Sequence, residues 1–316
     1  MTVISSATKS ITRTHSQSAP HLTEVADGVY AYLQPAGGWC LNNAGVLAGG
    51  DGTVVIDTVA TVRRALRLRE SVEAIGAGPV RTLVNTHHHG DHTFGNDVFG
   101  AVTIVAHHAA RTEMAESGLG LTALWPQVDW GEVRLALPTL TFEGRLTLHV
   151  GERRAELIHV GPAHTTNDVV VWLPADQVLF AGDVAMSGVT PFNLMGSVRG
   201  ALRAVNRLRR LGARTIVCGH GPVTGPEVLD ETAEYLEWIQ RLAADGAARE
   251  LTPLQVAREV GPGAFDHLID PERLVGNLHR AYAELAGGQL GRPLDVVKIF
   301  GEMIDYNGGT LPECLA

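Results

Sequence analysis

The chain has 316 residues, of which 45% are hydrophobic and 19% are charged, with a formal net charge of −9. This length is enough for one large domain with a sizeable core, or for one domain with a cap. The acidic balance argues against nucleic acid as a partner, because a phosphate backbone would be repelled on average.

The three cysteines, Cys40, Cys218 and Cys314, are too few and too scattered for a disulfide framework. No apolar run reaches the ~20 residues that a membrane span needs. Residues 1–20 are polar and rich in Ser and Thr, without the apolar centre of a signal peptide, and are expected to form a flexible tail. We therefore expect a cytoplasmic protein with no membrane partner and no nucleic-acid partner.

From residue 21 to about residue 225, short apolar runs alternate with Gly and Pro turns, which predicts alternating strands and helices. Strands are expected over 28–34, 44–47 and 53–57. A helix should follow and end at Gly76, with one face formed by Val62, Leu66, Arg69 and Ile75.

The strand expected over 81–86 leads into the most informative run of the chain, His87-His88-His89-Gly90-Asp91-His92. Imidazole suits zinc, and a carboxylate beside it suits a second cation. His87 and His89 are two residues apart, so an extended chain points both to one side and His88 to the other. Gly90 lets the chain turn before Asp91 and His92. The alternative is an incidental histidine tract on the surface.

Further candidate ligands follow three later strands. His164 comes after the strand expected over 155–160, Asp183 after 177–182, and His220 after 215–219. Each lies where an apolar run opens into a loop, which is where functional side chains concentrate. These partners favour a metal site over the surface-tract interpretation.

This pattern resembles the metallo-β-lactamase superfamily with two metals, over about residues 24–225. The resemblance implies an α/β fold of the αββα sandwich type and two Zn²⁺ per chain. It places His87, His89 and His164 on one metal, and Asp91, His92 and His220 on the other. Asp183 would bridge the metals, and Asp91 and Asp183 would be the catalytic residues. Asp57, at the end of a strand, and His88 are expected to orient the histidine loop by hydrogen bonds.

Aspartate at the bridging position departs from the zinc β-lactamases of the main subclasses, which have cysteine or serine there. Several segments are similar to the metallo-β-lactamase-fold cyclases of aromatic polyketide pathways in actinomycetes: GGWCLNNAG, LTALWPQVDWGE, GPAHTTNDVVVWLP, LFAGDVAMSGVTPF and the C-terminal YNGG and LPECLA. That resemblance implies action on a carrier-protein-bound polyketide, with aldol closure of a later ring and hydrolysis of the thioester. Metal binding lowers the pKa of water from ~15.7 to ~7, so one site could supply the base for both steps.

Three other interpretations remain open. A generic metallo-hydrolase, such as a lactonase or a β-lactamase-like enzyme, would share the whole metal site. An iron enzyme that resembles persulfide dioxygenases would share most of the ligands but would carry out redox chemistry. A non-catalytic binding protein of this fold would usually lack several ligands, and none is missing here.

After Pro226 the sequence becomes helical, and residues 226–316 are expected to form an extension that caps the site or forms a subunit interface in a homo-oligomer. Thr252-Pro253-Leu254-Gln255 is typical of a helix start with a capping box. Asp270-Pro271 opens a further helix that Gly287-Gly288 ends. Two faces have helical spacing: Leu229, Leu236, Ile239 and Ala243, and then Leu274, Leu278, Ala281 and Leu285.

Two further groups have both a functional and a structural interpretation. Trp125 and Trp130 could form a pocket wall that stacks on a flat polyketide, or could pack in the core or an interface. Four arginines at helical spacing could dock an acidic acyl carrier protein, or could form an ordinary solvated face: Arg199, Arg203, Arg207 and Arg210.

Overall fold

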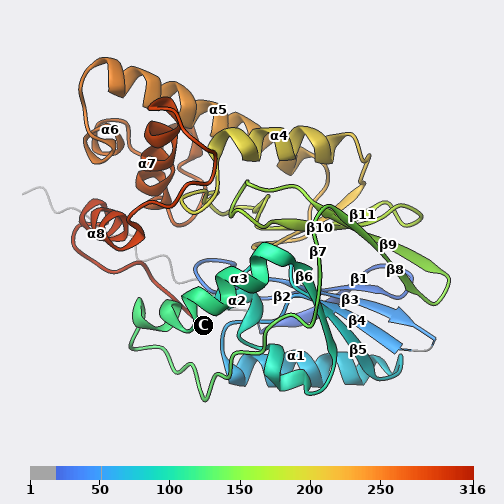
Figure 1. Cartoon of the computed structure of the whole chain (residues 1–316). Helices are drawn as coiled ribbons and strands as arrows, with labels where there is room; N and C mark the ends of the chain where they lie inside the picture. The colour runs from blue at the N-terminus through green and yellow to red at the C-terminus, as the bar shows by residue number, and fades with distance from the viewer. Residues whose placement is uncertain (1–18, 51) are drawn as a thin grey trace, which may run out of the picture.

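A computed structural model of the chain describes residues 19–50 and 52–316 (Figure 1). The expected N-terminal tail therefore lies outside the described residues, apart from its last two positions. The strands form two sheets. The first contains, in spatial and sequence order, β1 (His21–Ala26), β2 (Val29–Leu33), β3 (Ala44–Gly49), β4 (Gly52–Ile56), β5 (Val80–Val84), β6 (Thr103–His107) and β7 (Leu140–Phe142).

The second sheet has the spatial order β12-β11-β10-β9-β8. Its strands are β8 (Arg145–Val150), β9 (Arg153–His159), β10 (Val169–Leu173), β11 (Val178–Gly182) and β12 (Thr215–Cys218). The helices are α1 (Val62–Ile75), α2 (Gly90–Thr93), α3 (His108–Ser117), α4 (Val198–Arg209), α5 (Glu227–Ala248), α6 (Pro253–Val260), α7 (Arg273–Leu285) and α8 (Val296–Tyr306).

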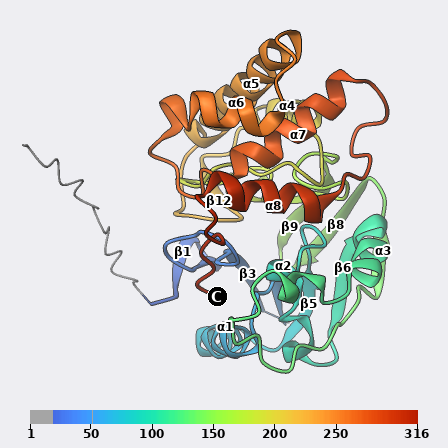
Figure 2. The same ribbon diagram turned by 90° about the vertical axis from the view of Figure 1, so that its left-hand side faces the viewer.

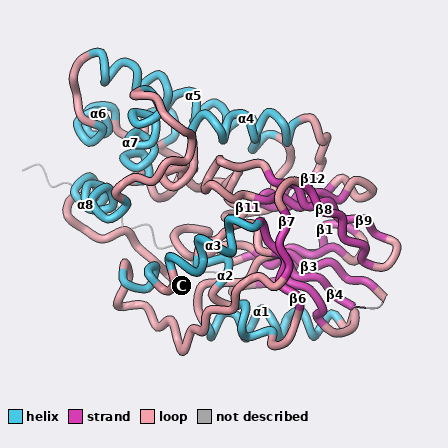
Figure 3. Tube along the Cα trace, viewed as in Figure 1, coloured by secondary structure: helices cyan, strands magenta, loops and turns pink. Residues whose placement is uncertain are grey.

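The two sheets lie face to face, with α1 on the outer side of the first sheet and α4 and α5 over the second (Figures 1 and 3). Alternation along β4 explains this layering. Val54 and Ile56 point into the apolar cluster between the sheets, while Val55 points to the cluster beneath α1. This arrangement, with helices following it at the C-terminus, confirms the expected α/β sandwich.

Helix α1 ends at Gly76 as predicted but does not have the predicted buried face. Thr61 caps its first turn by accepting from the backbone N–H of Arg64, and Gly76 ends it in the left-handed conformation at φ 73°. The core-facing side chains are Ala65, Leu68 and Val72, whereas Leu66 is 46% exposed. The predicted face containing Leu66 was wrong, because the buried side chains follow the i, i+3, i+7 spacing of Ala65, Leu68 and Val72, and Leu66 lies about 100° around the helix from Ala65.

The directions of the central strands determine where the site lies. β4, β5 and β6 are parallel to one another in the first sheet, and β11 and β12 are parallel in the second. The carboxyl ends of parallel neighbours lie at the same edge of a sheet. The loops that follow β4, β5, β11 and β12 therefore bring their side chains to neighbouring positions.

The C-terminal helices pack against α4 and extend the core of the sandwich. One continuous apolar cluster includes Ile158 of β9, Val205 of α4, Leu236 of α5 and Phe300 of α8. Helix α6 has both halves of the predicted capping box, between Thr252 and Gln255. Helix α8 crosses beside the sandwich edge in the perpendicular view (Figure 2). Within the described residues, no helix combines the length and apolar character that a bilayer span requires.

Candidate metal centre

Seven candidate ligands come together at one edge of the sandwich in two adjoining groups. The first, here the His87 group, consists of His87, His89, His164 and Asp183; the second, the Asp91 group, consists of Asp91, His92 and His220. Within each group the potential ligand atoms all lie within 4.8 Å of one another. The two groups are those implied by the sequence resemblance, and they come from four separate chain segments.

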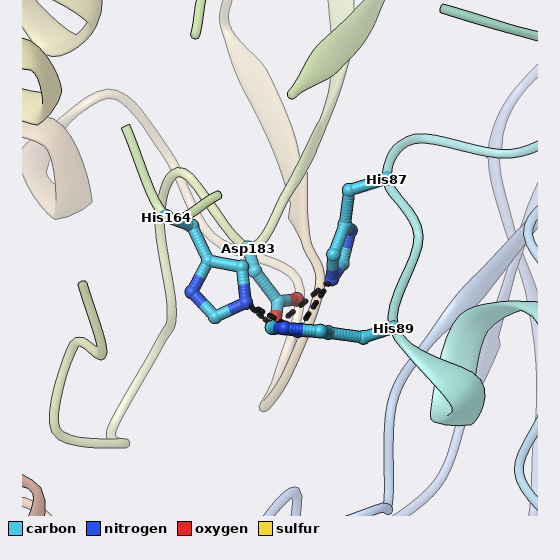
Figure 4. Close-up of side chains that lie close together, drawn as sticks. All are labelled: His87, His89, His164 and Asp183. Atoms are coloured by element: carbon cyan, nitrogen blue, oxygen red, sulfur yellow. Dashed lines mark hydrogen bonds and ion pairs between the residues drawn. The ribbon is translucent and has the colours of Figure 1, made fainter. Parts of the chain in front are cut away.

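In the His87 group the side chains converge from both sheets (Figure 4). His87 and His89 follow β5, with His87 Nε2 3.1 Å from His89 Nδ1. His164 lies in the loop between β9 and β10, and its Nε2 is 2.9 Å from the same His89 atom. Imidazole nitrogens this close together can bind the same cation.

Asp183, just after β11, connects the two groups. Its Oδ2 is 3.3 Å from His164 Nε2 and 3.4 Å from His220 Nε2, while its Oδ1 is 3.2 Å from His92 Nε2. In the Asp91 group, Asp91 Oδ2 lies 3.4 Å from His220 Nε2. One carboxylate in contact with both groups has the position that a bridging ligand needs.

Oxygen atoms fix the orientation of four of the five imidazoles. His87 Nδ1 contacts Thr86 Oγ1 at 3.0 Å, and His220 Nδ1 contacts the Gly37 carbonyl at 2.9 Å. His164 Nδ1 contacts the carbonyl oxygen of Phe192. In each case the other ring nitrogen faces the cluster, which is how metal-binding histidines are normally held. His89 differs, since its Nε2 faces the sulfur of Met195 at 3.4 Å.

Asp57 organises the first histidine loop. Its Oδ2 accepts from Thr86 Oγ1 at 2.7 Å and lies 2.9 Å from His92 Nδ1, while its Oδ1 accepts from the Thr86 backbone N–H at 2.7 Å. Asp57 is 3% exposed and adopts a left-handed conformation at φ 58°. The carboxylate thus orients His92 directly and His87 through Thr86.

Unpaired buried atoms fit a bound cation. His92 Nε2 and Asp183 Oδ1 are both buried and have no hydrogen-bond partner, although they lie close together. Leaving such atoms unpaired is unfavourable in a dry interior. A cation held by these atoms would satisfy both, so the donor set fits a metal centre of nitrogen and carboxylate ligands.

The histidines of the two groups have pKa values shifted in opposite directions. Burial, with smaller contributions from neighbouring imidazoles, holds the pKa of His87 and His89 well below the usual range, and burial lowers that of His164 to about 4. Burial also disfavours charge on His220, but Asp183 and Asp91 outweigh it and raise the pKa of His220 to about 9. The same carboxylates and Asp57 hold the pKa of His92 well above its usual range against burial.

Glycine is required immediately before His220. A Cβ at Gly219 would lie 1.8 Å from Asp183 Oδ1 and 2.7 Å from the Gly182 carbonyl carbon. Both distances are far below van der Waals contact. β11 and β12 can therefore bring Asp183 and His220 together only because position 219 has no side chain.

The candidate ligands open onto a cavity of about 410 Å³. Its walls are mostly apolar and come from several regions of the chain. They include Trp39 and Cys40 before β3, Leu121 and Leu124 after α3, Phe192 before α4, and Val296 and Phe300 of α8. A cavity of this size, apolar but next to polar ligands, is typical of a small-molecule site.

Trp125 and Trp130 do not line this cavity. Trp125 is fully buried, donates from Nε1 to the Pro312 carbonyl at 2.7 Å, and packs behind Trp39 at a ring-centroid distance of 5.5 Å. Trp130 is 8% exposed and donates to the Trp125 carbonyl. Both therefore have the core-packing role that the sequence left open, and Trp39 holds the cavity position instead.

His88 contributes to the cavity wall and points away from the metal groups. Asn167 Oδ1 accepts from its backbone N–H, and Asn167 Nδ2 lies 3.0 Å from its Nδ1, which is also 3.4 Å from Glu113 Oε2. His88 is thus held by Asn167, and its positioning role stays a prediction. Outside the site, the arginine stripe consists of Arg199, Arg203 and Arg207 of α4 and Arg210 at its C-cap. Arg203 and Arg210 are exposed, while Arg207 is half-buried and donates to the His159 carbonyl.

Comparisons with known proteins extend over most of the chain. The family model described as "Metallo-beta-lactamase superfamily" matches residues 37–220. A linear primary-alkylsulfatase from a Pseudomonas strain is 22% identical over 66% of this chain, which spans 48% of that relative. A hydroxyacylglutathione hydrolase from Methylococcus capsulatus is 26% identical over 70% of this chain and 77% of its own length. The solved structure of a metallo-beta-lactamase from Pontibacter korlensis has a TM-score of 0.59 and 21% identity, covering 69% of this chain and 99% of that one.

Proposed function

The chain belongs to the metallo-beta-lactamase superfamily of metal-dependent hydrolases, and from that premise we propose that it is a two-zinc thioesterase and cyclase. Its proposed substrate is an aromatic polyketide intermediate bound to a carrier protein. It would close a later ring by aldol-type chemistry and hydrolyse the thioester. The observation that carries the proposal is the pair of ligand groups sharing Asp183 beside a wide apolar cavity.

The chain's own residues supply the positioning for such a reaction. The His87 group and the Asp91 group would each hold one cation, and Asp183 would reduce the repulsion between the two positive charges. Bound metal would supply a base or nucleophile from water near neutral pH and would polarise the substrate carbonyl. Asp57, Thr86 and the carbonyls of Gly37 and Phe192 keep the imidazoles oriented throughout.

The cavity supports a bulky acyl group over a small polar one. Trp39, Phe94, Phe192 and Phe300 all contribute aromatic surface to its walls. Planar aromatic groups gain from stacked and edge-to-face contacts with such walls. The polyketide itself is indicated by the sequence segments that resemble polyketide cyclases, with Trp39 inside one of them.

A generic hydrolase is the second candidate. The relatives described above favour it, because they include an alkylsulfatase and a hydroxyacylglutathione hydrolase. Both candidates use the same ligand groups, so the substrate range separates them. The apolar cavity favours the first, since a compact polar substrate would leave most of that surface without contacts.

The test measures zinc content and substrate range together. Protein loaded with excess zinc should hold two zinc ions per chain by elemental analysis. It should release thiol from S-(2-naphthoyl)-N-acetylcysteamine and convert a bicyclic polyketone thioester to a ring-closed acid, read by mass spectrometry. Zinc content of one or less per chain would overturn the two-metal site. Efficient cleavage of a cephalosporin or a lactone, with no action on thioesters, would establish the generic hydrolase.

The arginine stripe on α4 gives the carrier protein a proposed docking surface. Arg203→Glu with Arg210→Glu should slow the reaction of a carrier-bound substrate, because acidic carriers are attracted by complementary charge. The same variant should leave the N-acetylcysteamine thioester unaffected, and added salt should shrink the difference. An equal rate with carrier-bound substrate would remove the stripe from the proposal.

A further inference from the structure

The loop of residues 37–40, here the Trp39 loop, touches both the candidate metal centre and the cavity. The Gly37 carbonyl orients His220 at 2.9 Å, while Trp39 and Cys40 line the cavity wall. The loop precedes β3 and belongs to the sandwich. The two charged side chains that contact Trp39, however, come from the C-terminal extension more than two hundred residues later in the chain.

Two adjacent residues at the start of α7 hold Trp39. The indole N–H of Trp39 donates to Glu272 Oε1 at 2.6 Å. The guanidinium carbon of Arg273 lies 4.1 Å from the centre of the Trp39 ring, within the range of a cation–π contact. One residue thus fixes the edge of the indole and the other covers its face. Phe192 and Phe300 complete the enclosure, with edge-to-face contacts at 5.2 Å and 6.0 Å.

Arg273 is itself fixed in place. Its Nη2 is 2.9 Å from Asp270 Oδ2, and its Nη1 donates to the Thr190 carbonyl at 3.1 Å. Arg273 is 2% exposed and Glu272 is 4% exposed. Asp270 also lies against Gly38, where a Cβ would meet its carboxylate oxygens at 3.4 Å and 3.5 Å. The start of α7 therefore contacts two consecutive residues of the Trp39 loop.

Packing alone does not account for these residues. Burying charged side chains is costly even when they are paired, and apolar residues of similar size often stabilise a core more. The Nε of Arg273 is buried without any hydrogen-bond partner, which adds to that cost. A specific position for the indole is what this arrangement provides and an apolar replacement would not.

We propose that Glu272 and Arg273 form a clamp that positions Trp39 as a fixed wall of the cavity, making the site selective for wide, planar acyl groups. An unclamped aromatic loop would have to be ordered each time a ligand binds, and that ordering weakens binding. The clamp removes this cost in advance. The thioester chemistry rests on the proposed function, whereas the clamp rests on the contacts of Trp39.

The first test compares acyl groups of different width. Glu272→Leu should lower the ratio of kcat/KM for S-(2-naphthoyl)- over S-acetyl-N-acetylcysteamine by about three- to tenfold, the range of one aromatic contact, mainly through KM for the naphthoyl substrate. Glu272→Gln keeps an oxygen acceptor for the indole and should restore the ratio. Glu302→Leu is the matched control, because Glu302 pairs with His279 in the same extension but does not line the cavity.

A double-variant cycle isolates the contact. Trp39→Phe removes the indole N–H, so adding Glu272→Leu to it should cause little further change in the ratio. A purely structural role predicts the opposite outcome, in which Glu272→Leu lowers both substrates equally and its effect adds to that of Trp39→Phe. That result would overturn the clamp. Thermal melts of each variant show whether the protein being assayed is folded.

A second measurement separates this inference from the proposed function. Binding of 2-naphthamide to zinc-free protein, measured by calorimetry, needs no chemistry. Its Kd should weaken about three- to tenfold in Glu272→Leu and in Arg273→Met, and should stay unchanged in Glu302→Leu. Equal binding by all variants would overturn the clamp even if thioesters are hydrolysed. Clamp-dependent binding without any thioester turnover would leave the clamp standing and remove the proposed function.

Discussion

At the scale of single residues, the candidate centre depends on side chains that are not themselves candidate ligands. Asp57 fixes the Thr86 backbone, the Thr86 hydroxyl and the His92 ring together. Such outer contacts hold a ring in the orientation that a metal requires, so that little entropy remains to be lost on binding. His89 has only a sulfur atom at its outer nitrogen and is the least constrained of the five imidazoles.

Replacing Asp57 therefore tests the outer contacts directly. Asp57→Ala should weaken zinc affinity about 10- to 100-fold, the usual range for a lost partner of a metal-bound histidine. Competition with a chelator of known affinity measures this. Asp245→Ala, an exposed aspartate of α5, is the control. Unchanged zinc affinity in Asp57→Ala would show that the His92 orientation does not depend on it.

Protons should compete with zinc at the Asp91 group alone. Without metal, the pKa of His220 is raised to about 9 and that of His92 is well above its usual range, so both carry protons at pH 7. The pKa of His164 is lowered to about 4, and His87 and His89 are also depressed, so the His87 group is already neutral. Zinc needs neutral imidazoles. Occupancy of the Asp91 group should thus release protons at pH 7, and its zinc affinity should rise as the pH is raised.

Calorimetry in buffers with different ionisation enthalpies reads that proton release. A binding enthalpy that does not depend on the buffer would contradict the assignment. The stability of the metal-free protein should change with pH in the opposite direction. Because its pKa is raised in the folded protein, His220 stabilises the fold fully at pH values below the usual pKa of histidine. This contribution should be lost as the pH rises through about 9.

The seven candidate ligands were predictable because each follows an apolar run at a strand end, a signal that is local in the sequence. Trp39 was not assigned to the cavity from sequence, because its position depends on contacts with Glu272 and Arg273 far along the chain. The same limit applied to Trp125. A large aromatic residue suits a core and a pocket wall equally, and only the tertiary contacts distinguish them.

At the scale of elements, the close approach of two strand ends makes the centre possible. β11 and β12 pair in parallel, and the loops after them carry Asp183 and His220. Helix limits were predictable where capping is local, as at Gly76 and at the Thr252 capping box. The face of α1 was not, because the depth to which Ala65 packs depends on the sheet beneath it.

Adding a methyl group at Gly219 should disrupt this approach. In Gly219→Ala the new Cβ would lie 1.8 Å from Asp183 Oδ1, so the carboxylate must move. We expect zinc affinity to fall about tenfold or more, as for other losses of ligand geometry. The control is Gly144→Ala, where a Cβ meets nothing within 4 Å. Normal zinc binding by Gly219→Ala would mean that the Asp183 position is not critical.

At the scale of the whole molecule, the sandwich and the C-terminal helices share one core. The cluster that includes Ile158, Val205 and Leu236 extends through α5, α7 and α8. Apolar residues at helical spacing predicted the change to helices after Pro226. They did not show how much apolar surface of the sandwich those helices cover. That property depends on the packing of distant segments.

A chain ending at residue 225 should therefore fail to fold as a smaller hydrolase. It would lose Leu229, Leu236, Ile239 and Phe300, each nearly fully buried. Burial of one such side chain contributes about 1.5–3 kcal/mol, while a whole domain is stable by only about 5–15 kcal/mol. Expression yield, circular dichroism and dye binding to exposed apolar surface measure the outcome. A soluble shortened chain with a cooperative melt would show that the sandwich is independent of the extension.

The origin of the ligands in both sheets has a consequence for how the protein responds to its surroundings. His87 and His92 follow β5 in one sheet, and Asp183 and His220 follow β11 and β12 in the other. A metal bound to these ligands would therefore link the two sheets, and its complete binding site exists only in the folded state. By mass action, free zinc at a thousand times its Kd would add about 4 kcal/mol to the stability of that state. The lifetime of the protein in a cell would then follow the supply of zinc, so that metal starvation removes the enzyme by unfolding as well as by inactivation.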